Sequence, residues 1–271
     1  MNCKPLFSIL IANYNNGCYI QEAIDSVFEQ TYSNWEVVIV DDGSTDGSLA
    51  IYNKYKEDNR IRVLFNGENK GCAYTKHQCV LHANGVYCGF LDPDDALLPN
   101  ALEVSVQLLM AHPQAVLSFS RFYDCDKFMN VIGESRPLTL MEGESYFEHH
   151  DYRAEQFAGF TREAYMRMGG LDVSLKGGVD ADLFFRLEEE GDVLISHEIT
   201  YKYRHCPSSI TANWARAFYW NLIIRHNTCI RRGLPVEKYS MRDFFEFSFG
   251  KSLEYTLLSV GEIVAKASVM D

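Results

Sequence analysis

Two short, almost continuous apolar runs near the start of the chain restrict its fold more than any other feature. Residues 7–12 and 37–40 are almost entirely apolar, as in strands that are buried on both faces. Each run ends abruptly in polar residues, Asn-Tyr-Asn at 13–15 and Asp-Asp at 41–42. Strands covered on both faces are typical of parallel sheets, whose connections carry helices. The two runs therefore predict an α/β protein.

The rest of the first half alternates between helix and strand patterns. Apolar residues at helical spacing follow the first run, and later segments repeat the alternation. Helices are expected at 19–28, 48–55, 73–83 and from Pro99 to about Met110, and strands at 61–65 and 86–91. This order predicts βαβ units, which form a mainly parallel sheet with helices on both faces.

The second half of the chain is less regular. A strand is expected at 115–120, helices at 161–168 and 180–190, and a strand at 193–195. Residues 121–152 form a long polar stretch with weak periodicity. Gly169 and Gly170 follow one predicted helix, as in a left-handed helix end. From Trp214 the pattern is helical and rich in aromatic residues.

The charge balance excludes one class of partner. The chain has 37 Asp and Glu against 25 Lys and Arg, which gives a formal net charge of −12. Proteins that bind nucleic acid need a basic surface to displace counterions from phosphates. We therefore expect no nucleic-acid partner.

Cysteine usage and hydropathy indicate the compartment. None of the eight cysteines forms a C-x-x-C pair, so free thiols in a reducing cytosol are expected. No signal-peptide pattern opens the sequence, and no apolar run approaches the roughly 20 residues of a membrane-spanning helix. We expect a cytoplasmic protein, with a peripheral contact at the inner face of the membrane left open.

A third polar cluster follows the predicted strand at 86–91. It has the sequence Asp-Pro-Asp-Asp at 92–95. A single cluster of this kind is typical of a turn. Three clusters on successive strands are more informative, because the carboxyl ends of parallel strands meet at one sheet edge, where ligands bind. Asp92 and Asp94 carry oxygen ligands that suit Mg²⁺ or Mn²⁺.

Several motifs together resemble those of family 2 glycosyltransferases of the GT-A fold. They cover about residues 5–210 in the family's order, and read FSILIANYNNGCYIQEAIDSVFEQTYSNWEVVIVDDGSTDGS, ENKGCAYTKH, GVYCGFLDPDDALLP, GGLD, VDADLFFRL and YRHCPSSIT. The resemblance implies a Rossmann-type, nucleotide-diphospho-sugar transferase-like sheet. It implies a catalytic domain at 1–212, with a nucleotide-binding half at about 1–98 and an acceptor half at about 99–212. A helical C-terminal extension follows at 213–271.

The resemblance also implies a reaction. It is an inverting transfer from a nucleotide-activated sugar, most often UDP-linked, to a hydroxyl of a glycan or lipid-linked glycan, assisted by Mn²⁺ or Mg²⁺. A cation stabilises the departing diphosphate, and a carboxylate takes the acceptor's proton during in-line attack. Two alternatives remain open, a non-catalytic nucleotide-sugar-binding protein and a nucleotidyltransferase.

The resemblance assigns roles to individual residues. It makes Asp180 the general base, with Asp182 and Arg186 as supporting residues. It assigns the cation to Asp92 and Asp94, with His205 as a further ligand or, alternatively, a surface histidine. It places the nucleotide sugar against Ala12, Asn13, Tyr14, Asp41, Asp42, Lys76, Asp92 and Pro93, with Tyr14 stacked on the base.

The chain departs from the family pattern at two places. Val179 stands where the family usually has Glu, a feature that favours the non-catalytic alternative. Lys76 and His77 stand where the family often has Arg and Asn. Lys76 then either contacts the nucleotide as a point charge or is a solvated lysine on a helix face.

Two further expectations concern charge and assembly. Seven carboxylates are expected around one cleft, which would repel a bare diphosphate, so the acidic excess predicts metal dependence: Asp41, Asp42, Asp92, Asp94, Asp95, Asp180 and Asp182. In the C-terminal extension, Arg231 and Arg232 near aromatic residues fit anionic lipid head groups. Packing of these helices onto the catalytic domain, or a homodimer through them, explains the same residues.

Overall fold

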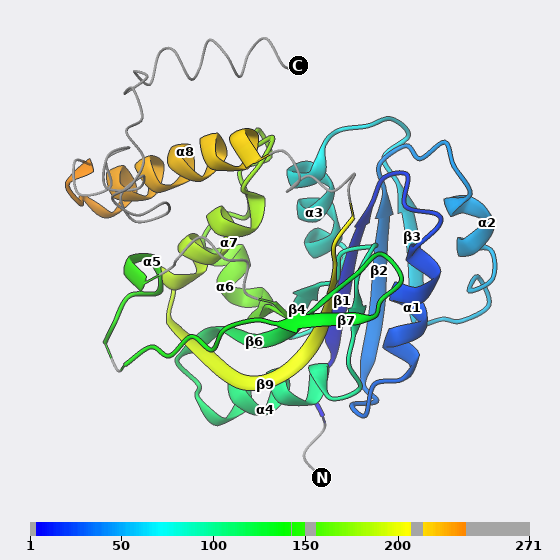
Figure 1. Ribbon diagram of the computed structural model, residues 1–271, viewed down its shortest axis with the longest axis horizontal. Helices are drawn as coiled ribbons and strands as arrows, with labels where there is room; N and C mark the ends of the chain where they lie inside the picture. Colours follow the sequence, from blue (N-terminus) through cyan, green and yellow to red (C-terminus); the bar gives the residue numbers. More distant parts are fainter. Residues whose placement is uncertain (1–3, 142, 150–155, 207–213, 237–271) are drawn as a thin grey trace. The chain divides into compact units, whose positions relative to one another are not determined.

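The computed structural model describes residues 4–141, 143–149, 156–206 and 214–236 (Figure 1). The chain divides into two units, 1–207 and 208–271. The predicted boundary between residues 212 and 213 falls in the segment 207–213, which lies outside the described residues, as does part of the polar stretch at 121–152.

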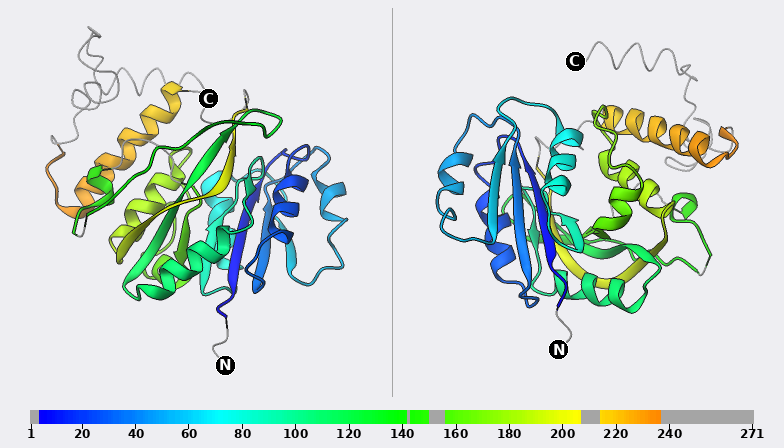
Figure 2. Two further views of the ribbon diagram at one scale, coloured as in Figure 1. Left: turned by 60° about the horizontal axis from the view of Figure 1, so that its bottom comes forward. Right: turned by 180° about the vertical axis from the view of Figure 1, so that it is seen from behind.

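Four parallel strands form the first half of the sheet in unit 1. Their order is β3 (Ile61–Phe65), β2 (Trp35–Asp41), β1 (Phe7–Asn13) and β4 (Tyr87–Phe90). The connections carry α1 (Ile20–Phe28), α2 (Ser48–Tyr52) and α3 (Cys72–Leu81). α1 and α3 lie on opposite faces of these strands (Figure 2). This confirms the predicted α/β class and βαβ order.

The register of these strands brings their polar ends together. Asn13 and Asp41 are direct neighbours at the ends of β1 and β2. One face of β1 and β2 packs on α1, and this part of the core includes Ile9, Ile24 and Val37. Because these core residues are fully buried and closely packed, they hold the strand ends in fixed positions at the sheet edge.

The second half of the sheet mixes strand directions. It continues from β4 through β8 (Gly159–Thr161), β6 (Ala115–Cys125), β9 (Asp192–Arg204) and β5 (Ala96–Leu97), and β7 (Val131–Glu134) pairs with β6. β6 and β9 are parallel, whereas β8, β7 and β5 pair with their neighbours in antiparallel fashion. The parallel character is thus strongest in the first half of the sheet, which belongs to the predicted nucleotide-binding half. β9 curves strongly along this half (Figure 1).

Four helices accompany these strands: α4 (Ala101–Ala111), α5 (Tyr146–His149), α6 (Arg162–Arg167) and α7 (Val179–Glu188). Gly169 and Gly170 have φ values of 81° and 79°, which confirms the left-handed end predicted after α6. Gly178 also has a positive φ, of 64°, at the start of α7. These glycines let the chain turn sharply before the helix that carries Asp180.

Unit 2 contains α8 (Trp214–Arg232), which confirms a helix beginning at Trp214. Residues 237–271 of the predicted extension lie outside the described residues. The expected membrane contact, packing or homodimer through the C-terminal helices therefore stays a prediction. Within the described part of the chain, no helix combines the length and apolar character needed to cross a bilayer.

Candidate active site

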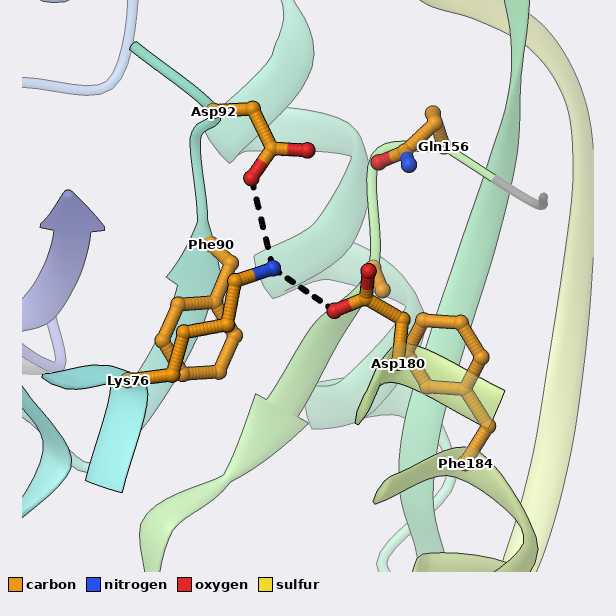
Figure 3. A pocket seen from close by; sticks show the side chains of 7 residues that line it. Lys76, Phe90, Asp92, Gln156, Asp180 and Phe184 are labelled. Carbon is orange, nitrogen blue, oxygen red and sulfur yellow. Dashed lines mark hydrogen bonds and ion pairs between the residues drawn. The ribbon is translucent and has the colours of Figure 1, made fainter. Parts of the chain in front are cut away.

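Lys76 connects two of the predicted site carboxylates. Its Nζ lies 2.7 Å from Oδ1 of Asp180 and 3.2 Å from Oδ1 of Asp92 (Figure 3). Asp92 follows β4, and Asp180 lies in the first turn of α7. The ring of Phe90 lies 4.9 Å from the same nitrogen. Two consecutive elements, α3 and β4, and a helix much later in the chain, α7, therefore meet at one ammonium group.

Burial decides between the two interpretations of Lys76. Its side chain is only 5% exposed, so the solvated alternative is wrong. Burial by itself disfavours the charged form, but the carboxylates of Asp180 and Asp92 outweigh it and raise the pKa of Lys76 well above its ordinary value. The two carboxylates thus favour the charged form of Lys76 inside the site.

A pocket opens beside this cluster. It has an empty volume of about 250 Å³ and is lined by Lys76, Phe90, Asp92, Gln156, Ala158, Asp180 and Phe184 (Figure 3). The lining combines apolar walls with a few polar groups that converge on one space, as binding sites for small molecules do.

The Asp92–Asp95 turn places two carboxylates close together. Burial, and then the charge of Asp92, raise the pKa of Asp94 to about 6. Pro93 between them is buried. Two carboxylates that disfavour each other's charge, one of them desolvated, fit a divalent cation, which would relieve the repulsion.

The remaining ligands of such a cation would come from outside this turn. Among the residues that the structure describes, no three His, Cys, Asp or Glu side chains are grouped to hold a metal ion. Mg²⁺ and Mn²⁺ commonly use one or two carboxylates together with water and substrate phosphates. Asp92 and Asp94 alone are consistent with that mode.

Asp95 holds the turn in place. It is 2% exposed and accepts hydrogen bonds from the Tyr201 hydroxyl at 2.8 Å and the Arg204 backbone N–H at 2.7 Å. The Arg204 guanidinium donates to the Asp94 carbonyl at 2.6 Å and pairs with Glu22 of α1. Asp95 therefore faces the protein interior rather than the cleft, which differs from the expected cluster of seven carboxylates.

Asn13 and Asp41 also point into the protein. Asn13 Nδ2 donates to the Tyr52 hydroxyl at 2.7 Å and to Ser48 Oγ at 3.0 Å. Asp41 Oδ2 accepts from Tyr52 at 2.7 Å. Both residues are almost fully buried, so their side chains anchor α2 at the sheet edge. Ala12, directly before Asn13 in the chain, is half-buried.

Asp42 and Tyr14 lie at the same sheet edge, but the Asp42 side chain is hydrogen-bonded to the protein and the Tyr14 ring is exposed. The Asp42 carboxylate accepts from Asn66 Nδ2 and from the backbone N–H groups of Lys70 and Gly71, all at 2.8–2.9 Å. It thus orders the loop that leads into α3. Tyr14 is 47% exposed, which leaves its ring accessible for the predicted stacking on a base.

The sequence and the architecture both match known proteins. The profile described as Glycosyl transferase family 2 matches residues 8–169. The chain belongs to glycosyltransferase family 2. This membership favours glycosyl transfer over the nucleotidyltransferase and non-catalytic alternatives.

One curated relative of this family 2 glycosyltransferase is a hyaluronan synthase of Pasteurella multocida. The two are 29% identical over 265 residues, which cover 94% of this chain and 26% of the relative. The chain thus spans about a quarter of the length of that relative.

Two solved structures share the GT-A fold of this family 2 glycosyltransferase. S. aureus TarS 1–349 in complex with UDP-GlcNAc has a TM-score of 0.72 at 20% identity, covering 93% of this chain and 76% of that TarS chain. The mannosyltransferase PcManGT of Pyrobaculum calidifontis, in complex with GDP-Man and Mn²⁺, has a TM-score of 0.68 at 17% identity, covering 99% and 81%. These matches confirm the predicted fold.

His205 has a partner other than the aspartate turn. Its Nε2 lies 2.7 Å from Oδ1 of Asp124 on β6, and its side chain is 52% exposed. The segment that follows it, 207–213, lies outside the described residues. The role of His205 as a metal ligand in this family 2 glycosyltransferase stays a prediction.

The predicted supporting residues Asp182 and Arg186 follow Asp180 on α7. Asp182 is buried, and its Oδ2 lies 2.8 Å from Nε of Arg186. Val179, the departure from the family pattern, is also buried, at 6% exposure. The first turn of α7 therefore presents Asp180 to the pocket and turns Val179 and Asp182 inward.

Sequence reasoning missed four lining residues of the pocket, one of which is Ala158, directly before β8. Phe184 lies one helical turn after Asp180 on α7, and this spacing could have indicated it. Phe90 ends the strand before Asp92. Gln156 lies in the irregular region before β8, where no periodic pattern could have indicated it.

Proposed function

We propose that this glycosyltransferase moves a sugar from a UDP-sugar to a hydroxyl of a glycan or lipid-linked glycan, with inversion at the anomeric carbon of the transferred sugar. The observation that carries the proposal is the Lys76 bridge between Asp92 and Asp180. It places a carboxylate at the predicted cation turn and a second carboxylate across one small pocket.

Asp180 has one oxygen available for proton transfer. Its Oδ1 accepts from Lys76, while Oδ2 has no partner among the described residues. We assign Oδ2 as the atom that takes the proton from the acceptor hydroxyl. The freed oxygen attacks the sugar carbon, the bond from that carbon to the phosphate oxygen breaks, and its electron pair leaves with UDP. Direct attack from the opposite side inverts the carbon.

The leaving side of the reaction belongs to the aspartate turn. Asp92 and Asp94 would hold a divalent cation, which when bound supplies charge stabilisation for the departing diphosphate. Asp95 and Arg204 keep these carboxylates in position through the hydrogen bonds described above. The mannosyltransferase PcManGT, whose structure contains Mn²⁺, supports the use of a divalent cation.

The names of similar proteins support the substrates. TarS binds UDP-GlcNAc in one of its structures, which supports a UDP-linked donor. A relative named hyaluronan synthase supports a glycan as acceptor. The exposed Tyr14 ring at the same sheet edge offers a surface on which a base could stack.

The variant Asp180→Asn tests the assignment of the base. We expect sugar transfer to fall by about 10²–10⁴-fold, because the amide cannot take a proton, while the dissociation constant for UDP in the presence of Mn²⁺ stays within about twofold. Asp192→Asn, an exposed position at the start of β9, is the matched control. Full transfer activity in Asp180→Asn would eliminate this base.

A further inference from the structure

Gln156 has the one lining side chain whose polar group lacks a protein partner. The residue is 8% exposed, and its side-chain amide has no hydrogen-bond partner in the described part of the chain. Its backbone is fixed, because its carbonyl accepts from Ser120 Oγ at 3.0 Å and the next N–H donates to the same hydroxyl at 2.8 Å. Figure 3 shows the amide pointing toward the pocket. An amide that faces the pocket without a protein partner is available to donate to and accept from a ligand.

The rest of the pocket indicates the shape of that ligand. Phe90, Phe184 and Ala158 supply apolar walls, and Asp180 and Asp92 supply carboxylates. A single sugar ring, which has apolar C–H faces and polar hydroxyls at its rim, fits this lining of apolar walls and polar groups.

The charges of the pocket indicate which sugars fit. Among the described lining residues Lys76 is the only cation, and both Asp92 and Asp180 already compete for it. A carboxylate on the sugar would add a third negative charge beside these two without a cation of its own. An amide can instead donate to and accept from neutral hydroxyl or acetamido groups.

We propose that Gln156 is a specificity-determining residue that hydrogen-bonds the donor's sugar ring, and that the pocket selects neutral sugars over uronic acids. This inference rests on the proposed function, since it identifies the pocket as the place of the transferred sugar. It identifies the class of the donor sugar, which the motifs of the sequence leave open.

The test measures donor selectivity of the 271-residue chain with Mn²⁺. UDP release from UDP-glucose, UDP-N-acetylglucosamine and UDP-glucuronic acid is compared, and binding of UDP alone is measured by titration calorimetry. The wild type should use the better neutral donor at least about tenfold more efficiently than UDP-glucuronic acid. Gln156→Leu should lower kcat/KM for that neutral donor by about 10–100-fold with unchanged UDP affinity.

Two further variants keep the test decisive. Gln107→Leu on α4, at an exposed position, is the matched control and should change nothing. If Gln156→Leu fails to fold, Gln156→Glu retains the size but adds a negative charge, and should lower kcat/KM for the neutral donor in the same way.

Two results would overturn the inference. One is use of UDP-glucuronic acid as efficiently as the neutral donors by the wild type. The other is a neutral-donor kcat/KM within twofold of wild type in the folded Gln156 variant. Failure of the wild type to bind UDP at all would instead refute the proposed function, so the two failures are distinguishable.

Discussion

Replacement of Lys76 by methionine should have opposite effects on folding and on cation binding. Lys76 is a counter-ion for Asp92 and Asp180 when no metal is present. Its removal leaves two carboxylates without their cation, which destabilises the fold. The same removal frees Asp92 for a divalent cation, which therefore binds more tightly.

The distances and exposed fractions in the structure give the size of both effects, on Mn²⁺ affinity and on the free energy of unfolding. At the 3.2 Å separation of Lys76 and Asp92, Coulomb's law gives about 1.3 kcal/mol even at the dielectric constant of water. This lower limit corresponds to about tenfold tighter Mn²⁺ binding. Breaking a fully buried ion pair costs about 3–5 kcal/mol. Because the Asp92 and Asp180 side chains are 33% and 40% exposed, water screens them, and we expect a loss of about 1–3 kcal/mol in the free energy of unfolding.

Calorimetric titration of the nucleotide-free protein with Mn²⁺ measures the affinity for the cation, and urea unfolding in EDTA measures the free energy of unfolding. Lys56→Met removes an exposed lysine, 67% exposed beside Glu57, and should leave both unchanged. Lys76→Arg keeps the charge and should bind Mn²⁺ as the wild type does. Mn²⁺ binding to Lys76→Met that equals or falls below wild type would refute the counter-ion argument.

Two further predictions follow from the turn and from the glycine pair. The pKa of Asp94 is about 6 in the fold, raised by burial and by Asp92, against 3.8 ordinarily, so the unfolded chain loses this proton first. The contribution of Asp94 to stability should therefore fall as pH rises from about 4 to 6, and Asp94→Asn should flatten that part of a urea-unfolding series in EDTA; an unchanged slope would contradict the shift. Gly170→Ala should lower the free energy of unfolding by about 2–5 kcal/mol, because φ is 79° and a Cβ would lie 2.7 Å from Cε1 of His77. Gly169 has a φ of 81°, but a Cβ there would meet open space, so Gly169→Ala should lower the free energy of unfolding by only about 1–2 kcal/mol. Equal losses in the two variants would exclude a contribution from the contact with His77.

Helical spacing already contained the information that places Lys76 inside. The residue lies three positions after Ala73 and four before Val80, and all three are buried on α3. Such spacing puts residues on one face of a helix. A charged residue on a buried face requires a partner of opposite charge, but the partner comes from α7, more than one hundred residues later. Local pattern identifies the face, and only the tertiary fold identifies Asp180.

The sequence pattern underestimates the length of β9 for a different reason. A strand is expected at 193–195, whereas the observed strand is Asp192–Arg204. Its pairing with β6 shifts register around Phe119 and Arg121, where β9 carries extra residues. A bulge interrupts the alternation of inward and outward side chains, and the two-residue period by which strands are predicted is lost. The polar stretch expected at 121–152 likewise contains the end of β6, then β7 and α5.

The hydrogen bonds of Asp95 have a consequence for synthesis of the chain. Its partners Tyr201 and Arg204 follow it by 106 and 109 residues. When only the first hundred residues have been made, β1 to β4 are complete and Lys76 can pair with Asp92, yet Asp95 still lacks the Tyr201 and Arg204 groups that hold it. A fragment that ends near residue 98 would possess β1 to β4 but would lack the hydrogen bonds that hold Asp95. The predicted nucleotide-binding half therefore depends on β9, the last strand of the sheet, to complete its predicted cation turn.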